Sequence, residues 1–95
     1  MVYYDIHTHH LPVHPEDAAI VNSLVPTFDV GTGLFRSVGI HPWELTEHNA
    51  GQLLDYLKQQ LRKKQFVAVG EAGLDKLAVA SMELQLTVFK AQVRL

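Results

Sequence analysis

The sequence contains no cysteine. Disulfide bonds and thiolate ligands are therefore excluded, and any metal ion must be bound by histidine and carboxylate groups. No apolar run approaches the roughly 20 residues of a membrane span, and the opening residues lack the basic and apolar regions of a signal peptide. We therefore expect a cytoplasmic protein without a membrane partner. The formal net charge is only -2, so composition indicates neither disorder nor a basic surface for nucleic acid.

The chain is also short. Its 95 residues, of which 47% are hydrophobic, predict one small domain, residues 1–95. A domain of this size buries a smaller share of its surface than a typical enzyme domain does. An active site in such a chain must therefore consist of few residues or be completed by another chain.

Predicted strands and helices alternate along the chain. Apolar runs predict strands over residues 2–9, 18–25, 34–40 and 66–69. Pro15-Glu16-Asp17 leaves a helix open as the alternative for residues 18–25. The alternation indicates an α/β fold with a parallel sheet and right-handed crossovers.

Two segments have apolar residues at helical spacing. The first helix is expected from Ala50 to Leu61, with Asn49 as its cap. The second is expected after a Ser81 cap. Its apolar side is predicted from four residues: Met82, Leu86, Phe89 and Val93.

Polar residues follow the predicted strands at their carboxyl ends. The first strand ends in Asp5-Ile6-His7-Thr8-His9, and side chains two apart on a strand share a face, so both imidazoles can converge on one ion. By itself this motif also arises by chance. His41 and Glu71 follow later strands, at the edge where parallel α/β folds gather their catalytic loops. A carboxylate with two imidazoles suits Mg²⁺, Mn²⁺ or Zn²⁺.

Three segments, 5–9 (DIHTH), 38–42 (VGIHP) and 69–75 (VGEAGLD), resemble in order three signatures of the TatD family of metal-dependent deoxyribonucleases and hydrolases. The resemblance spans residues 2–75. The interval between His9 and His41 is shorter than expected of the family, which predicts that the first helix is reduced to a loop or a turn. It implies a (β/α)₈ barrel of the amidohydrolase type, and an enzyme that hydrolyses phosphodiester bonds, typically trimming DNA from the 3′ end. The family's later ligands, two histidines and an aspartate, have no counterpart before Leu95. We therefore expect about half of a TIM-type barrel, the N-terminal part of a truncated chain.

The resemblance also implies roles for single residues. His7 and His9 correspond to metal ligands, and Glu71 corresponds to the catalytic carboxylate that ligates or bridges two divalent ions. His41 matches a catalytic histidine that lies beside the metals and contacts substrate phosphate. Two such ions can lower the pKa of a shared water and stabilise charge on the phosphoryl oxygens. Asp5 is expected to orient an imidazole, or else to form an ordinary ion pair on the strand face.

Other polar and aromatic residues receive less specific predictions. Trp43 is expected to pack at the base of a loop, with stacking on a base as the alternative. Asp75 is expected to form loop or helix-start hydrogen bonds. Gly70 and Gly73 predict close backbone approach or a strained turn near the metal, with a plain loop as the alternative. The remaining histidines are expected in loops: His10, His14 and His48.

Three functions remain open from the sequence. The first is a TatD-type hydrolase whose partner is DNA or another phosphodiester. The second is another metallohydrolase that opens with the same histidine pair, either a PHP-type phosphoesterase or an amidohydrolase acting on C–N bonds. The third is a metal-binding fragment that is inactive or depends on a partner. An incomplete barrel has an unpaired edge, so self-association through that edge is also expected.

Overall fold

The computed structural model describes residues 4–12, 14, 16–24 and 35–95. Its strands and helices follow the predicted order. In chain order they are β1 (Tyr4–Thr8), β2 (Ala18–Leu24), β3 (Phe35–Gly39), the short 3₁₀ helix η1 (Pro42–Glu44), α1 (Ala50–Gln60), β4 (Phe66–Val69) and α2 (Met82–Val93). The helical alternative for residues 18–24 is thereby excluded. The predicted strand ends at residues 2–3, 25 and 34 lie outside the described residues.

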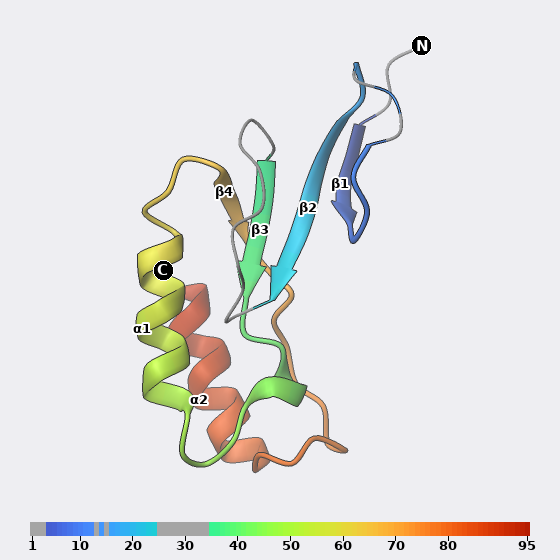
Figure 1. Cartoon of the computed structure of the whole chain (residues 1–95). Helices are drawn as coiled ribbons and strands as arrows, with labels where there is room; N and C mark the ends of the chain where they lie inside the picture. The colour runs from blue at the N-terminus through green and yellow to red at the C-terminus, as the bar shows by residue number, and fades with distance from the viewer. Residues whose placement is uncertain (1–3, 13, 15, 25–34) are drawn as a thin grey trace.

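The four strands form one parallel sheet in the order β1-β2-β3-β4 (Figure 1). Each strand pairs with the next one along the chain, as successive strands do in a (β/α) barrel. The prediction of an α/β fold with part of such a barrel is confirmed. No helix occurs among the described residues between β1 and β2, as the short interval predicted.

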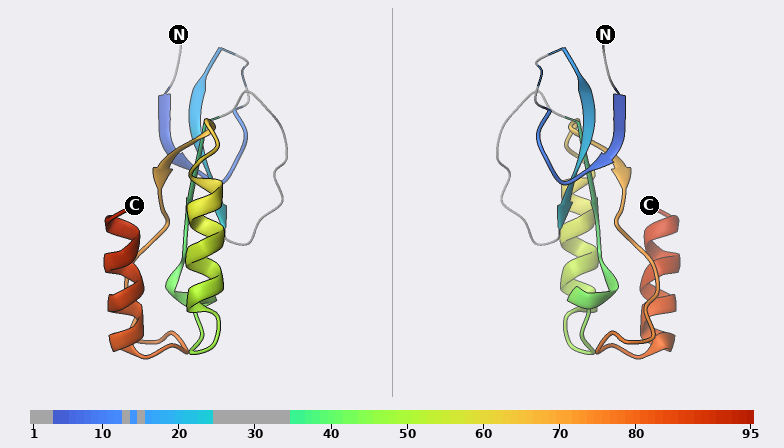
Figure 2. Two further views of the ribbon diagram at one scale, coloured as in Figure 1. Left: turned by 90° about the vertical axis from the view of Figure 1, so that its left-hand side faces the viewer. Right: turned by 90° about the vertical axis from the view of Figure 1, so that its right-hand side faces the viewer.

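The core lies between the sheet and the two helices. Figure 2 shows α1 and α2 side by side, next to the end of the sheet that β3 and β4 form. The buried apolar cluster consists of Val38, Ile40, Leu45, Leu53, Leu57, Phe66, Ala80 and Val88. It includes no residue of β1, so β1 is held by its pairing with β2 rather than by this core.

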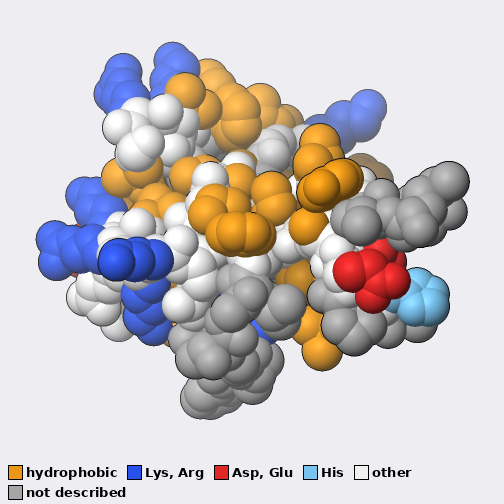
Figure 3. Space-filling view, turned by 90° about the horizontal axis from the view of Figure 1, so that it is seen from above, with side chains coloured by type: hydrophobic (Ala, Val, Ile, Leu, Met, Phe, Trp, Pro, Cys, Tyr) orange, Lys and Arg blue, Asp and Glu red, His pale blue; other side chains and the backbone are white. Residues whose placement is uncertain are grey.

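Several apolar side chains are left outside this core. The exposed ones on the strands are Tyr4, Ile6, Phe35, Val67 and Val69. Figure 3, which views the molecule from the end where the strands begin, shows hydrophobic side chains gathered across the middle of that face. These side chains are therefore not covered by the described part of the chain.

The helix α2 is confirmed, but the predicted apolar side does not face the core. Most of that predicted side is exposed: Met82, Leu86 and Val93. The buried side consists of Gln85, Val88 and Gln92. The two glutamines are buried because their amides form hydrogen bonds with loop backbone, which apolar periodicity cannot reveal.

One of the two predicted helix caps is correct. Ser81 caps α2, since its hydroxyl accepts a hydrogen bond from the Leu84 N–H at 3.1 Å. Asn49 precedes α1 but its side chain makes no cap hydrogen bond. It instead accepts from the Thr46 N–H and donates to the Glu44 carbonyl, so it stabilises the preceding loop.

Truncating Leu57 to alanine is expected to destabilise the fold strongly. Its side chain is fully buried in the core between α1 and the sheet. Deleting a buried leucine side chain costs about 2–5 kcal/mol, since it removes apolar contacts and leaves a cavity. Urea unfolding followed by circular dichroism measures the loss. Leu77→Ala is the matched control because that side chain is 86% exposed, and a loss in Leu57→Ala no larger than in this control would contradict the assigned core.

Neither α1 nor α2 has the length and apolar content that crossing a membrane requires, and this holds for every helix in the described part of the chain.

Candidate metal centre

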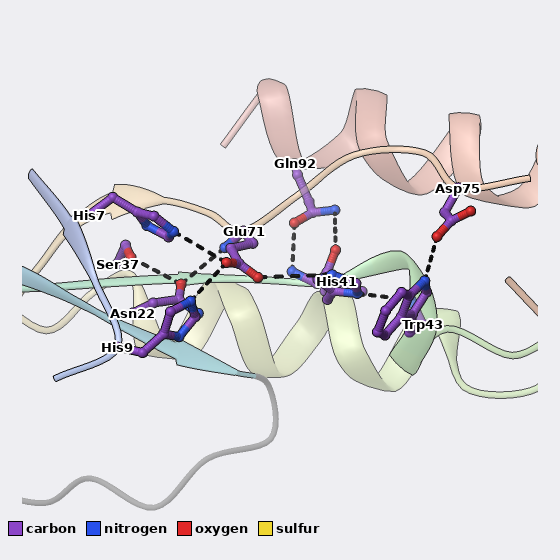
Figure 4. A network of polar contacts seen from close by, with 10 residues as sticks. His7, His9, Asn22, Ser37, His41, Trp43, Glu71, Asp75 and Gln92 are labelled. Carbon is purple, nitrogen blue, oxygen red and sulfur yellow. Dashed lines mark hydrogen bonds and ion pairs between the residues drawn. The ribbon is translucent and has the colours of Figure 1, made fainter. Parts of the chain in front are cut away.

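Two histidines and a glutamate meet at the carboxyl end of the sheet. The Nε2 atoms of His7 and His9 lie 3.2 and 3.1 Å from the same oxygen, Oε1 of Glu71. One ligand atom from each residue lies within 4.8 Å of the other two. Figure 4 shows both imidazoles pointing at the carboxylate from β1 and the residue after it. Three potential ligands therefore converge on one point.

Sheet curvature brings these residues together. β1 and β4 are the outer strands of the sheet and are separated by β2 and β3. His7 and His9 nevertheless contact Glu71, which follows β4 after one residue. A flat sheet would hold the first and fourth strands far apart, since neighbouring strands are about 4.8 Å apart. The contact therefore depends on the curl that a barrel requires.

Two residues that the sequence analysis missed support Glu71. The Asn22 Oδ1 on β2 accepts hydrogen bonds from the Glu71 backbone N–H and from the Ser37 hydroxyl on β3, both at 3.1 Å. These bonds fix the start of the loop that follows β4 against the two central strands, β2 and β3. The available signal was a single amide side chain inside the apolar run of residues 18–25, because a polar group on a buried strand needs a partner.

Close backbone approach occurs between Gly39, which was not predicted, and the segment of Gly70 and Glu71. A Cβ atom on Gly39 would lie 2.6 Å from the Glu71 carbonyl oxygen and 2.8 Å from the Gly70 carbonyl carbon. A Cβ on Gly70 or Gly73 would meet nothing within 4 Å. The prediction of close approach is therefore wrong for Gly73. At Gly70 the backbone is closely approached by β3, but the residue that must be glycine for this contact is Gly39. Gly39 lets β3 run directly against the loop that carries Glu71.

His41 lies beside the three converging residues. Its Nε2 is 3.9 Å from Oε2 of Glu71. Its Nδ1 accepts a hydrogen bond from the Trp43 N–H at 3.1 Å, which leaves the ring proton of the neutral imidazole on Nε2. This orientation directs an N–H donor toward the carboxylate edge. Burial raises the pKa of the nearby Glu44 carboxyl, although His41 opposes the shift.

The backbone before His41 is fixed by α2. The Ile40 N–H donates to Oε1 of Gln92 at 2.8 Å, and Nε2 of Gln92 donates to the Ile40 carbonyl at 3.4 Å. Gln92 is almost fully buried. One amide thus satisfies both backbone groups where β3 ends and the His41 loop begins.

Asp5 has a different partner from the one predicted. Its Oδ1 accepts from the backbone N–H of His7 at 3.1 Å. The pairing of β1 with β2 is irregular between Asp5 and Thr8, so the expected shared face of Asp5 with the histidines does not follow from strand alternation. Support of an imidazole by Asp5 stays a prediction. The other histidines are exposed, as expected of loop side chains: His10, His14 and His48.

Trp43 is exposed, so the prediction that it packs at the base of a loop is wrong. Its side chain is 69% exposed and contacts the His41 ring edge-on, with 5.0 Å between the ring centroids. The indole Nε1 donates to Oδ2 of Asp75 at 2.5 Å. Asp75 Oδ1 also accepts from the Leu77 N–H at 2.9 Å, which confirms the predicted loop hydrogen bonding. The hydrogen bond from the Leu77 N–H, and to a smaller extent that from the Trp43 indole, lowers the pKa of the Asp75 carboxyl.

A partial parallel barrel with histidines and a carboxylate at its carboxyl edge is typical of barrel-type metal-dependent hydrolases. The family model described as TatD related DNase matches residues 13–95. The chain belongs to this family, as the resemblance of its three segments indicated. The matched residues include His41 and Glu71 but not the segment of His7 and His9, so the position of these two histidines beside Glu71 is an independent observation. No curated protein and no solved structure matches the chain.

Proposed function

We propose that this TatD-type hydrolase uses divalent metal to cleave phosphodiester bonds in DNA. The family match supports the hydrolase class. The observation that carries the proposal further is the convergence of His7, His9 and Glu71 on one point. Among the open alternatives, the family match favours this reading over a PHP-type phosphoesterase or an amidohydrolase acting on C–N bonds.

The donor set fits a divalent ion. Two imidazole nitrogens and one carboxylate can bind Zn²⁺, Mn²⁺ or Mg²⁺. Imidazole suits Zn²⁺ best, and carboxylate suits Mg²⁺ and Mn²⁺. The side chains of His7, His9 and Glu71 are 52%, 57% and 32% exposed, which leaves room for substrate oxygens and further ligands. Glu71 has a second oxygen, Oε2, directed to the side of His41. A carboxylate with both oxygens available is suited to bridging the two ions that the family resemblance implies.

Each residue has a role that follows from its position. His7, His9 and Glu71 would hold the ion, and a bound divalent ion supplies Lewis acidity that acidifies water and neutralises charge on phosphoryl oxygens. The Nε2–H of His41 is suited to donate a hydrogen bond to a phosphate oxygen. Asn22 and Ser37 hold the Glu71 backbone so that its carboxylate needs little rearrangement.

The experiment that tests the function follows nucleotide release from single-stranded DNA in Mg²⁺ or Mn²⁺. We expect release that EDTA abolishes and that His41→Ala lowers by about 10²-fold or more, since one positioned donor to developing charge contributes about that much. His48→Ala is the control because His48 is exposed and lies in the loop before α1. Release that is unaffected by EDTA would contradict the proposal. Folded protein that binds Mn²⁺ without releasing nucleotide would favour the non-catalytic alternative.

The same assay tests the proposed self-association. β1 and β4 each have only one neighbouring strand among the described residues, and apolar side chains on both are exposed. Pairing of these edges between copies would cover unpaired backbone groups and bring further side chains to the metal centre. Activity should then rise faster than in proportion to chain concentration. A strictly proportional rise, with a monomeric mass by light scattering, would contradict self-association.

A further inference from the structure

Trp43 is exposed and held in place at the same time. It is the only tryptophan in the chain, and 69% of its surface is exposed. Its backbone N–H is bound to His41 and its indole N–H to Asp75. Asp75 is itself fixed, because its backbone N–H donates to Gln85 and its carbonyl accepts from the same buried amide. The anchoring buries little of the ring, so its apolar surface stays available, and a ring that is already held in place loses less entropy when it binds a ligand.

The tryptophan lies between two hollows. The first, of about 320 Å³, is lined by His41, Trp43, Glu71, Leu74 and Asp75 among others. The second, of about 260 Å³, is lined by Trp43, Asp75, Leu77, Ala78 and Val79. Only the first reaches Glu71. A ligand group in it would lie against the indole while its neighbouring group reaches the metal centre.

Distances along this line suit one nucleotide unit. Oε2 of Glu71 lies 3.9 Å from the His41 ring nitrogen, and the His41 and Trp43 ring centroids are 5.0 Å apart. Figure 4 shows Glu71, His41, Trp43 and Asp75 in this order. The Asp75 carboxylate at the far end repels a phosphate, while the His41 N–H and a metal ion attract one. Charge therefore orients a nucleotide with its phosphate at His41 and its base at Trp43.

We propose that Trp43 is the stacking platform for a nucleobase adjacent to the scissile phosphate, a subsite that selects nucleic acid over other phosphodiesters. This rests on the proposed function, since it assigns the substrate's base to a place beside that centre. Every base has a face that stacks on an indole, so the subsite is expected to accept all four bases. The anchoring by Asp75 orients the ring, which makes Asp75 a positioning residue.

Fluorescence tests the proposal directly because all tryptophan emission comes from Trp43. The protein in Mn²⁺ is titrated with 2′-deoxyadenosine 5′-monophosphate and, separately, with 2-deoxyribose 5-phosphate, which lacks the base. We expect saturable quenching by the nucleotide and binding of the sugar phosphate that is about 5- to 150-fold weaker, the range that one stacked base contributes. Equal affinity for the two ligands, or no quenching by either, would overturn the proposal.

Variants extend the test to the residue itself. Calorimetry should show that Trp43→Leu weakens nucleotide binding to the level of the sugar phosphate, while Trp43→Phe keeps most of it because a flat ring remains. Leu77→Ala is the matched control, since Leu77 lines only the second hollow. A loss in Leu77→Ala with none in Trp43→Leu would overturn the assignment. Circular dichroism checks that each variant is folded.

Failure of this subsite differs from failure of the proposed function. With Glu71→Ala, hydrolysis of DNA should be lost and both ligands should bind more weakly, since the metal ion no longer holds their phosphate. The preference for the nucleotide over the sugar phosphate should remain, because the base contacts Trp43 and not the carboxylate. Hydrolysis with equal rates on substrates with and without a base next to the cleaved bond would overturn the subsite alone. Base-dependent quenching without any metal-dependent hydrolysis would overturn the function alone.

Discussion

Glu71→Gln is expected to weaken Mn²⁺ binding by more than about 100-fold, a larger loss than removal of a group that only supports a ligand. Both imidazoles approach the same Glu71 oxygen, at 3.2 and 3.1 Å. The substitution keeps the shape of the side chain but removes the negative charge that holds a divalent ion between neutral imidazoles. The two histidines alone form an incomplete ligand set. Isothermal calorimetry with Mn²⁺ and Zn²⁺ measures the change in affinity.

The control for this experiment is His48→Ala, which removes an exposed imidazole from another loop. The affinity of this variant for Mn²⁺ and Zn²⁺ should equal that of the unchanged chain. His7→Ala and His9→Ala should each reduce binding, because the three ligand atoms lie within 4.8 Å of one another. Unchanged affinity in Glu71→Gln would mean that any bound ion lies elsewhere, and would refute this centre.

Gly39→Ala is expected to impair both the fold and the metal centre, although Gly39 carries no functional group. The added Cβ would lie 2.6 Å from the Glu71 carbonyl oxygen, closer than the atoms can approach. The neighbouring atoms belong to backbone and cannot turn aside, so β3 and the loop must separate. Overpacking of this kind costs about 1–3 kcal/mol. Because the displaced segment carries Glu71, affinity for Mn²⁺ should fall together with the free energy of unfolding.

Gly73→Ala separates this effect from a general cost of replacing glycine. A Cβ at Gly73 meets nothing within 4 Å, and the residue lies in the same loop as Glu71. Urea unfolding and calorimetry should leave this variant close to the unchanged chain. Equal losses in both variants would contradict the assignment of close approach to Gly39.

Much of the architecture was predictable from local sequence. Residues 18–25 and 66–69 are short apolar runs, and Ala50 to Leu61 has helical spacing. The structure confirms the strands over residues 18–24 and 66–69 and the helix over residues 50–60. Ser81 was recognisable as a cap because a hydroxyl before a helix has one local partner. Asn49 met the same criterion but bonds to Thr46 and Glu44 instead. The Asn49 amide can bond either to the first turn of α1 or to the backbone of the preceding loop. Spacing along the chain does not show which of the two it does.

The buried side of α2 was not predictable from its apolar residues. Gln85 and Gln92 face the core because the loops at Asp75 and Ile40 present backbone groups there that need partners. Met82 and Leu86 are consequently left on the outer side. The buried side of a helix is set by the groups that pack against it. For α2 these groups include Ile40, which is 52 positions from Gln92.

For the candidate metal centre, too, one part was predictable from local sequence and another part was not. The sequence by itself determined which residues have the chemistry for a metal site, His7, His9 and Glu71, and that each lies at the carboxyl end of a strand, because residue type and strand periodicity are local properties. Only the tertiary structure decided that residues of the first and fourth strands meet at one oxygen, that Asn22 holds the Glu71 backbone, and that Gly39 provides the space. Sheet curvature and backbone contact join segments distant in sequence, so no local pattern contains them.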